Sequence, residues 1–323
     1  MSSAARPVVV MKFGGTVTGS PWRMQALVKM VAEAVETVRP VLVVSALSGV
    51  TRQLDRGLQA VVAARRNGGA PHETIDALIE DLRTRHMEQA EELLDMAALS
   101  TYQTALNERL ADLQSVLQTV AQTGFTPAHR DAVLATGEQC SVPMVVAALQ
   151  VRGMRAEAGD ATTLIRTDDT YGEANVDLAL SHKQVARWFA DLADEAIPVV
   201  AGFIGRDGGT VTTLGFEGSD YTAALMASFT NAASLTRFTD VEGIYTADPN
   251  TDAAAQRIDQ LTMEQAFAWT ESGRLGMHPK TLRPLAEANI PMQVRCIDRP
   301  HAPGTQICPA SVMDPVFWPP IAG

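Results

Sequence analysis

Four separated strings of the sequence combine glycines with charged or hydroxyl side chains that could bind and transfer a phosphoryl group. They are residues 12–16 (KFGGT), 45–51 (SALSGVT), 215–220 (GFEGSD) and 239–249 (TDVEGIYTADP). Moving a phosphoryl group requires backbone N–H donors and fixed cations around the transferred charge, with the acceptor oxygen held in line. Taken together, the four strings predict phosphoryl transfer.

The first two strings supply a cation, a flexible turn and hydroxyl groups. Gly14 and Gly15 let the backbone approach a phosphate with no Cβ in the way, and Lys12 offers a compact positive charge to its oxygens. Ser45 and Thr51 belong to a hydroxyl-rich loop that suits a small polar ligand. Glycine turns and hydroxyl-rich loops are also common structural features, so one string alone does not indicate a function. The indication comes from the four strings together.

The other two strings supply acidic side chains and the start of a helix. Ser219 or Asp220 could cap a helix whose free N–H groups attract a phosphate or a carboxylate. Asp240, Tyr245 and Asp248 fall in one loop, which could hold the ribose and base of a nucleotide or lie near Mg²⁺. An ordinary helix cap and an Asp-Pro turn are the structural alternatives for these two strings.

Apolar, β-branched segments precede these strings, which predicts that the strings lie where buried strands end. An amphipathic helix between the first two strands predicts a right-handed crossover and therefore parallel strands. We predict helices over residues 221–231 and 263–269, and a helical hairpin over residues 72–122 that covers the sheet. We predict strands over residues 7–13, 40–45, 154–158, 197–204, 211–214, 234–238 and 290–296.

These elements predict an α/β fold, namely a three-layer α/β/α sandwich with a mostly parallel central sheet. We expect residues 1–308 to form one catalytic domain of two lobes, 1–205 and 206–308, that face each other across a cleft. Residues 309–323 are short and rich in proline, so we expect a C-terminal tail.

The composition indicates a small-molecule partner. A net charge of −11 opposes binding to nucleic acid or to an anionic membrane, since either needs an excess of Lys and Arg. The longest apolar segments are too short to cross a bilayer, and the N-terminus lacks the apolar core of a secretory signal. Neither the cysteines nor the histidines have metal-ligand spacing. We therefore expect a cytoplasmic chain with no metal site of its own.

In combination, these motifs resemble the catalytic domain of the aspartokinases, within the amino-acid kinase family. The resemblance covers about residues 7–308. The first, second and fourth strings match the family's KFGGT, VSAMSGVT and TDVDGIYTADP. Further matches are Thr136-Gly137-Glu138 with the family's GE segment, residues 202–218 with GF(x)nTTLGRGGSD, and the pairs His278-Pro279 and Ile290-Pro291 near the end.

The resemblance implies a kinase that uses ATP and Mg²⁺ to convert an amino-acid carboxylate into an acyl phosphate, and it implies a homodimer. The amino acid would bind in the first lobe and the nucleotide in the second. Lys12 would stabilise the transferred group and Asp220 would orient Lys12 or the metal. By position, the path of the group would be lined by Gly14, Gly15 and Ser45. The amino acid would be held by Thr51, Glu138 and Ser219, and Glu138 would pair with its ammonium group. The nucleotide would be held by Thr239, Asp240, Tyr245 and Asp248.

Three departures from the family pattern concern the substrates and regulation. Phe216 replaces the arginine that family members use against a substrate carboxylate, and Glu217 replaces a glycine. Loss of such a guanidinium–carboxylate pair should weaken aspartate binding by on the order of a few kcal/mol. Leu275 stands where members commonly have a nucleotide-contacting lysine, although Arg274 could substitute. The chain also stops where ACT domains usually begin, so we expect no feedback control through such domains.

These departures leave three hypotheses. The first is a kinase that phosphorylates the side-chain carboxylate of aspartate or of an aspartate-like amino acid. The second is a catalytically silent pseudokinase that binds nucleotide or a partner chain. The third is a kinase whose acceptor is a phosphate or phosphonate, which Glu217 disfavours because it would repel a dianion.

Overall fold

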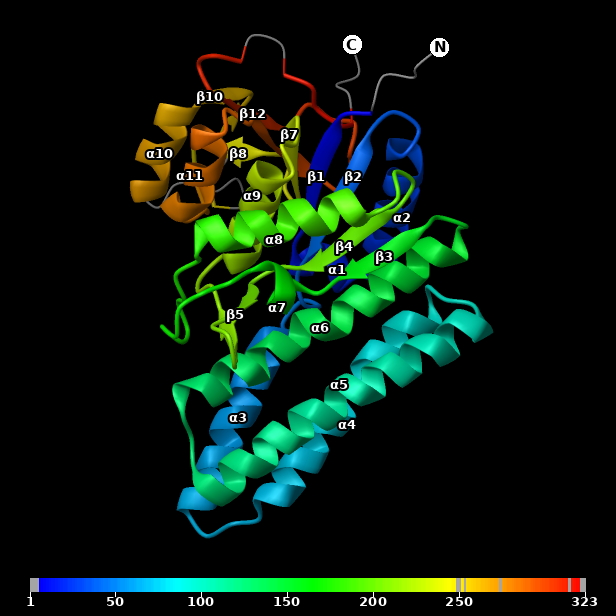
Figure 1. Cartoon of the computed structure of the whole chain (residues 1–323), viewed down its shortest axis with the longest axis vertical. Helices are drawn as coiled ribbons and strands as arrows, with labels where there is room; N and C mark the ends of the chain where they lie inside the picture. Colours follow the sequence, from blue (N-terminus) through cyan, green and yellow to red (C-terminus); the bar gives the residue numbers. More distant parts are fainter. Residues whose placement is uncertain (1–5, 248–250, 253, 273–274, 313–314, 320–323) are drawn as a thin grey trace.

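A single eight-stranded sheet forms the centre of the computed structural model, which describes residues 6–247, 251–252, 254–272, 275–312 and 315–319 (Figure 1). Its strand order is β10-β12-β11-β7-β1-β2-β4-β3, and every neighbouring pair of these described strands is parallel except β11 and β12. The bounds are β1 (Val8–Phe13), β2 (Arg39–Val44), β3 (Ala156–Gly159), β4 (Ile197–Ala201), β7 (Ser234–Thr239), β10 (Gln260–Thr262), β11 (Met292–Cys296) and β12 (Thr305–Cys308).

Helices cover both faces of this sheet. The connections from β1 to β2 and from β2 to β3 run in one direction across the sheet, and the later ones from β3 to β4, β7 and β11 run back. Because parallel crossovers are right-handed, the two directions place their helices on opposite faces. One layer contains α2 (Pro21–Ala34) and α6 (Pro127–Val151), and the other contains α8 (Leu178–Asp191), α9 (Gly218–Phe229) and α11 (Pro279–Glu287). The predicted three-layer sandwich with a mostly parallel sheet is confirmed.

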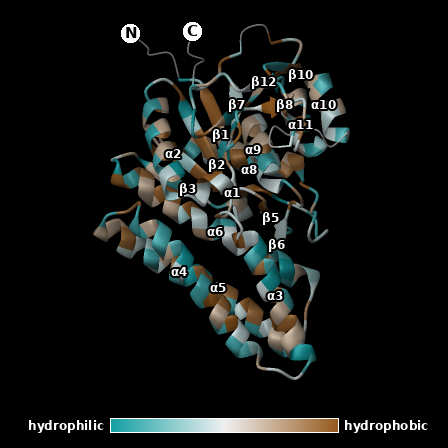
Figure 2. Ribbon diagram, turned by 180° about the vertical axis from the view of Figure 1, so that it is seen from behind, coloured by the Kyte–Doolittle hydropathy of each residue, from teal (hydrophilic) through white to brown (hydrophobic). Residues whose placement is uncertain are grey.

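The predicted helical hairpin forms, but it does not cover the sheet. Helices α4 (Pro71–Glu91) and α5 (Met96–Thr123) pack on each other, on α3 (Val50–Arg66) and on α6, and they extend away from the strands (Figure 1). The side chains of α5 that recur at helical spacing are buried in this helical subdomain, and α5 carries alternating hydrophobic and hydrophilic bands (Figure 2). The expectation was wrong because helical spacing marks a buried face without saying what covers that face.

Helix α6 lies between the sheet and the hairpin. It is the one helix in the described part of the chain that is long and apolar enough to span a bilayer, and 78% of its most apolar window is buried inside the protein. Two-sided packing explains this composition, because strands contact one side of α6 and α5 contacts the other.

Several short elements differ from the sequence predictions. The strand predicted over residues 197–204 divides into β4 and β5 (Ile204–Arg206), because Phe203 takes a φ of 72° and turns the chain. Strand β5 pairs antiparallel with β6 (Val211–Thr213). Short elements without a sequence prediction are β8 (Ile244–Tyr245), β9 (Arg257–Ile258), β10, β12, α1 (Gly15–Thr18) and α7 (Ala161–Leu164), and the longer helices α3, α6, α8 and α11 had none either. Helix α10 (Met263–Glu271) extends a predicted helix.

The β5–β6 hairpin is fastened to α6 by one fully buried carboxylate, that of Asp131. Its Oδ2 atom accepts hydrogen bonds from the backbone N–H of Gly172, at 2.9 Å, and of Thr213, at 2.7 Å. Its Oδ1 atom accepts one from the Thr213 hydroxyl, at 2.9 Å. Asp131 therefore fixes β6, and the string that follows it, against the helix that carries Glu138.

Asp131→Ala should destabilise the fold, because it leaves two backbone N–H groups and a hydroxyl without their acceptor in a buried place. We expect the free energy of unfolding to fall by about 2–5 kcal/mol, measured by urea denaturation. Asp112→Ala, on the exposed side of α5, is the matched control and should leave stability nearly unchanged. Equal stabilities of the two variants would contradict a fastening role for Asp131.

Candidate active site

The carboxyl ends of four central strands bring the predicted strings to one edge of the sheet. Strands β1, β2, β4 and β7 are parallel neighbours or next neighbours, so their carboxyl ends share that edge. Residues 14–16 follow β1, residues 45–51 follow β2, and Thr239 ends β7. The string at residues 215–220 arrives from β6 and leads into α9. This edge is where ligands bind in open α/β sheets.

A buried ion pair joins two of these strings. Lys12 Nζ lies 2.9 Å from Asp220 Oδ2, and the two side chains are 7% and 5% exposed. On the other side of the carboxylate, Arg237 Nε lies 3.0 Å from Oδ1. Burial acts to raise the pKa of Asp220, but the attraction of Arg237 and Lys12 outweighs it and holds that pKa below its usual value. Asp220 is therefore an ionised carboxylate shared by two cations, and we call these three residues the charge cluster.

The glycine turn after β1 fits closely around this cluster. A Cβ on Gly14 would lie 3.6 Å from Lys12 Nζ, and one on Gly15 would lie 3.2 Å from the carbonyl oxygen of Ala46. The turn is held to the loop after β2, because the Thr18 hydroxyl donates to that same Ala46 oxygen at 2.8 Å. The two glycines thus leave the backbone exposed beside the ammonium group, as phosphate approach requires.

Helix α4 supports both loops from the outside. The Arg85 guanidinium donates a hydrogen bond to the carbonyl oxygen of Ser48, in the loop after β2. The Gln89 amide donates to the carbonyl oxygen of Thr18, at the end of α1. The helical hairpin therefore holds the loops of the site in place although it does not cover the sheet.

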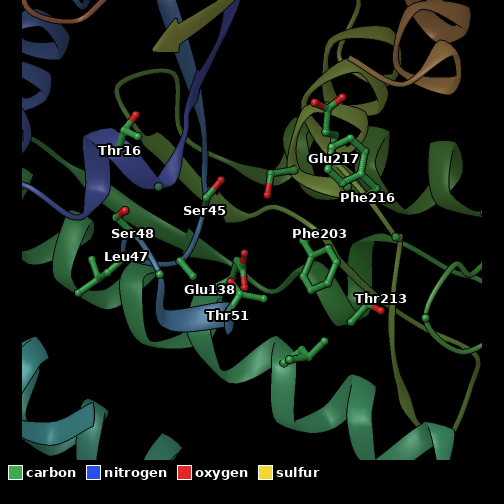
Figure 3. A pocket seen from close by; sticks show the side chains of 18 of the residues that line it. Thr16, Ser45, Leu47, Ser48, Thr51, Glu138, Phe203, Thr213, Phe216 and Glu217 are labelled. Carbon is green, nitrogen blue, oxygen red and sulfur yellow. The ribbon is translucent and has the colours of Figure 1, made fainter. Parts of the chain in front are cut away.

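A cavity of about 630 Å³ opens beside the charge cluster (Figure 3). Its walls come from the loop after β2, from α3 and α6, and from the segment between β4 and α9. Figure 3 shows Glu138 and Thr51 in the middle of the cavity, with Ser45 on one side and Phe203, Thr213 and Phe216 on the other. Ser219 also lines it, so all four residues predicted to line the amino-acid side, Ser45, Thr51, Glu138 and Ser219, meet in one cavity.

Glu138 is the most unusual group in this cavity. Its side chain is 3% exposed, and its Oε2 atom has no hydrogen-bond partner among the described residues. Burial raises the pKa of Glu138 to about 8, against the weaker opposing effects of the Ala46 N–H and the Lys12 charge. A buried carboxylate oxygen without a partner is costly, so this position favours a ligand that brings a positive charge.

The helix start in the third string differs from the prediction. Neither Ser219 nor Asp220 caps α9. The helix begins at Gly218, and the cap residue is Glu217, which has the left-handed values φ 57° and ψ 26° and makes no side-chain cap. Asp220 is instead free to bind Lys12 because its side chain points out of the first helical turn toward β1. The family glycine would take the left-handed conformation with less strain than Glu217 does.

Phe216 and Glu217 stand together at the rim of the cavity (Figure 3). Phe216 is 77% exposed, which is unusual for a phenylalanine. Glu217 is partly buried, and burial raises its pKa although Arg237 attracts its charge. The position of the family arginine is therefore occupied by an apolar ring beside an acidic group.

Two of the residues predicted to hold a nucleotide, Thr239 and Asp240, lie at the carboxyl end of β7. The Thr239 hydroxyl donates to Asp240 Oδ1 at 3.1 Å, and Asp240 lies 3.9 Å from Arg23. Tyr245 belongs to the short strand β8. Asp248 and Arg274 lie outside the described residues. Leu275 is 4% exposed and belongs to the hydrophobic core, so its position supplies no cation.

Three residues that the sequence reasoning missed contribute to the site. Arg237 and Thr239 are two residues apart on β7, so they project from the same face of the sheet. A charged residue inside a predicted buried strand was the signal that could have identified Arg237. Arg130 lies eight residues before Glu138 on α6, so helical spacing places it on the same face, and it lines the cavity. Phe203 lines the cavity because its positive φ turns the chain after β4, which no local sequence signal indicated.

Magnesium would need few protein ligands here. The described residues contain no group of three or more His, Cys, Asp or Glu side chains that could hold a metal ion. Mg²⁺ is usually held by one or two carboxylates together with the phosphates of its substrate. The unpartnered Oε2 atom of Glu217 and the carboxylate of Asp220 fit that sparse arrangement.

Comparisons with known proteins agree with this geometry. The model of the amino acid kinase family matches residues 7–296. Lysine-sensitive aspartokinase 3 of Escherichia coli is 32% identical over 96% of this chain and 66% of that protein. Bifunctional aspartokinase/homoserine dehydrogenase 2 of Zea mays is 30% identical over 93% of this chain and 32% of that protein. The chain thus spans just under two thirds of the first relative and a third of the second.

A solved structure gives the same picture. Escherichia coli aspartokinase III in complex with aspartate and ADP superimposes with a TM-score of 0.84 at 30% identity. The match covers 96% of this chain and 66% of that one.

Asp220→Leu should destabilise the protein because it leaves the Lys12 ammonium group buried without a counter-charge. We expect a loss of about 3–5 kcal/mol in the free energy of unfolding, measured by chemical denaturation. The double variant Lys12→Met/Asp220→Leu removes both charges and should be more stable than the single variant. If the double variant is no more stable, the effect comes from lost packing or from Arg237, which loses the same carboxylate, and not from the unpaired Lys12 charge.

Proposed function

The chain belongs to the amino acid kinase family, and we propose that it is an ATP-dependent kinase whose acceptor is the side-chain carboxylate of aspartate or of an aspartate-like amino acid. The observation that carries this proposal is one juxtaposition. The buried Lys12–Asp220 ion pair lies at the strand ends beside a cavity that contains the unpartnered carboxylate of Glu138. The likeness to a structure that contains aspartate and ADP supports it.

In the proposed reaction, the acceptor carboxylate attacks the terminal phosphorus of ATP and the bond to ADP breaks. A side-chain carboxylate is already ionised at neutral pH, so no base is needed to remove a proton from the acceptor. The transition state carries its charge on the phosphoryl oxygens, where Lys12 and the backbone at Gly14 and Gly15 would stabilise it. Asp220 would act as a positioning residue by holding Lys12. When bound, Mg²⁺ would neutralise charge on the phosphates.

The two substrates would occupy different lobes. We assign the amino acid to the lobe of residues 1–205. There Glu138 would pair with its ammonium group and Thr51 would also bind the amino acid. Ser45 would line the path of the transferred group. Ser219, from the second lobe, would complete this side. The nucleotide would bind in the lobe of residues 206–308, at Thr239, Asp240, Tyr245 and Asp248. The family resemblance also implies a homodimer.

The rim of the cavity bears on the identity of the acceptor. Phe216 offers an apolar contact where a guanidinium would bind a second carboxylate, and Glu217 adds a charge that would repel one. We therefore propose that the end of the amino acid that does not react is less negatively charged than that of free aspartate.

A catalytically silent nucleotide-binding protein is the second candidate. The observation in its favour is the combination of Phe216, Glu217 and the buried Leu275, which removes two cations that the family pattern would supply. The charge cluster counts against it, because a protein that only binds has little need of a buried ammonium group beside a glycine turn.

Turnover separates the two candidates. With ATP, Mg²⁺ and hydroxylamine, the protein should convert aspartate or at least one member of a panel of aspartate derivatives into a hydroxamate. Lys12→Ala should lower the rate about 10²- to 10³-fold, because it removes the cation from the transferred group, whereas Lys29→Ala on α2 should not change it. No hydroxamate with any acceptor would support the silent protein instead. Hydroxamate formed at equal rates by Lys12→Ala and the wild type would contradict the role of Lys12.

Binding of the amino acid should depend on pH through Glu138. Its pKa of about 8 means that the carboxyl group is mostly protonated at pH 6 and must lose that proton to pair with an ammonium group. KM for the amino acid should therefore fall by up to about tenfold per pH unit as the pH rises from 6 to 8. Glu138→Gln should bind weakly and show no such dependence. A KM that is flat with pH in the wild type would refute this role.

A further inference from the structure

Arg237 is the group in the site that neither the predicted residues nor the proposed chemistry has used. It lies in β7, where it is the direct register partner of Lys12 on β1. Residues that face each other on neighbouring strands project from the same side of the sheet. Phe13 and Phe238, one residue further along, project from the opposite side and stack with their rings 5.0 Å apart. The guanidinium and the ammonium group therefore emerge together on the side that α9 covers.

The contacts of Arg237 leave most of its donors free. Its Nε atom lies 3.0 Å from Asp220 Oδ1, but the contact lacks the alignment of a hydrogen bond and is an ion pair only. Within the described part of the chain, the remaining N–H groups of Arg237 have no hydrogen bond or second ion pair. The side chain is 21% exposed, against 7% for Lys12 and 5% for Asp220. Arg237 is thus the member of the charge cluster that solvent, or a ligand, can reach.

The charges of the cluster do not cancel. Two cations share one carboxylate, so the cluster itself keeps a net positive charge beside the glycine turn, and Glu217 attracts both cations from outside it. The other arginines near this edge are already committed, since Arg23 pairs with Asp298 at 2.8 Å and Arg130 with Asp55 at 2.8 Å. Thr239 follows Arg237 by two residues and so projects from the same side of β7.

We propose that Arg237 is a second phosphate-binding residue, which places its free guanidinium N–H groups on the phosphates of the nucleotide while Asp220 holds it beside Lys12. The inference rests on the proposed function insofar as ATP is the donor. A guanidinium presents several donors in a rigid fork that matches phosphate oxygens, so it can bind a phosphate and keep its carboxylate contact at once. Arg237 would then supply the cation that the buried Leu275 does not.

Nucleotide binding measures this role without turnover. Calorimetry with Mg²⁺ would compare AMP, ADP and a non-hydrolysable ATP analogue in the wild type and in Arg237→Met. We expect the variant to bind the ATP analogue about 10- to 100-fold more weakly, because charge-assisted hydrogen bonds to phosphate are lost, while AMP binding stays unchanged. Arg237→Lys keeps the charge and should lose less than Arg237→Met. Arg109→Met, on the exposed side of α5, is the matched control.

Two results would overturn the inference. Binding of the ATP analogue by Arg237→Met within about twofold of the wild type would make Arg237 only a structural partner of Asp220. An equal loss for AMP and the ATP analogue would indicate a distorted site and not a phosphate contact. If Arg237→Met does not fold, Arg237→Gln is measured against the same expectations. No nucleotide binding by the wild type would overturn the proposed function itself, so the two failures are distinguishable.

Discussion

The buried ion pair between Lys12 and Asp220 is the interaction on which the rest of the site depends. The two residues are 208 positions apart in the sequence, yet they meet at 2.9 Å because β1 and α9 lie in adjacent layers. Removing a charged group from water costs on the order of several kcal/mol per ion, and only close pairing of the two charges offsets that cost. The pair therefore fixes the register between the first strand and the helix of the third string.

The other features of the site can be understood as responses to that constraint. The ammonium group needs a turn without side chains beside it, which Gly14 and Gly15 provide. The carboxylate must leave the first turn of α9 toward β1, which is possible because Glu217, and not Asp220, occupies the cap. Glu138 stays unpaired because Lys12 is already held by Asp220. The cavity thus keeps the unpartnered Oε2 atom of Glu138, while Arg237 shares Asp220 with Lys12 and has further N–H groups to donate.

The sequence was a good guide where structure follows from local patterns. The apolar segments before Lys12 and Ser45 predicted buried parallel strands, and the rule that parallel strands end at one edge predicted that their loops would meet. Those predictions rest on periodicity and on the handedness of crossovers, which a single sequence contains. The amino-acid side of the site was predicted residue by residue only through the family resemblance.

What could not be predicted depends on contacts between distant residues. The place of the helical hairpin follows from which helix faces fit together, and periodicity gives no partner. The backbone at Phe203 is held by distant residues, since its N–H donates to the Thr222 hydroxyl at 3.0 Å and its carbonyl oxygen accepts from the Leu214 N–H at 2.8 Å. The register that sets Arg237 beside Lys12 appears only once β7 is placed next to β1. Each of these depends on contacts that form only in the assembled fold.

The support that Arg85 and Gln89 give to the loops after β1 and β2 has a consequence for how this protein can change over time. The hairpin that carries them packs mainly on α3 and α6, so its exposed residues can be exchanged without changing a contact with the strands. A small rotation of α4 would nevertheless shift two backbone oxygens next to the reacting groups. Substitutions on α4, which does not line the cavity, can therefore adjust the loops around the candidate site.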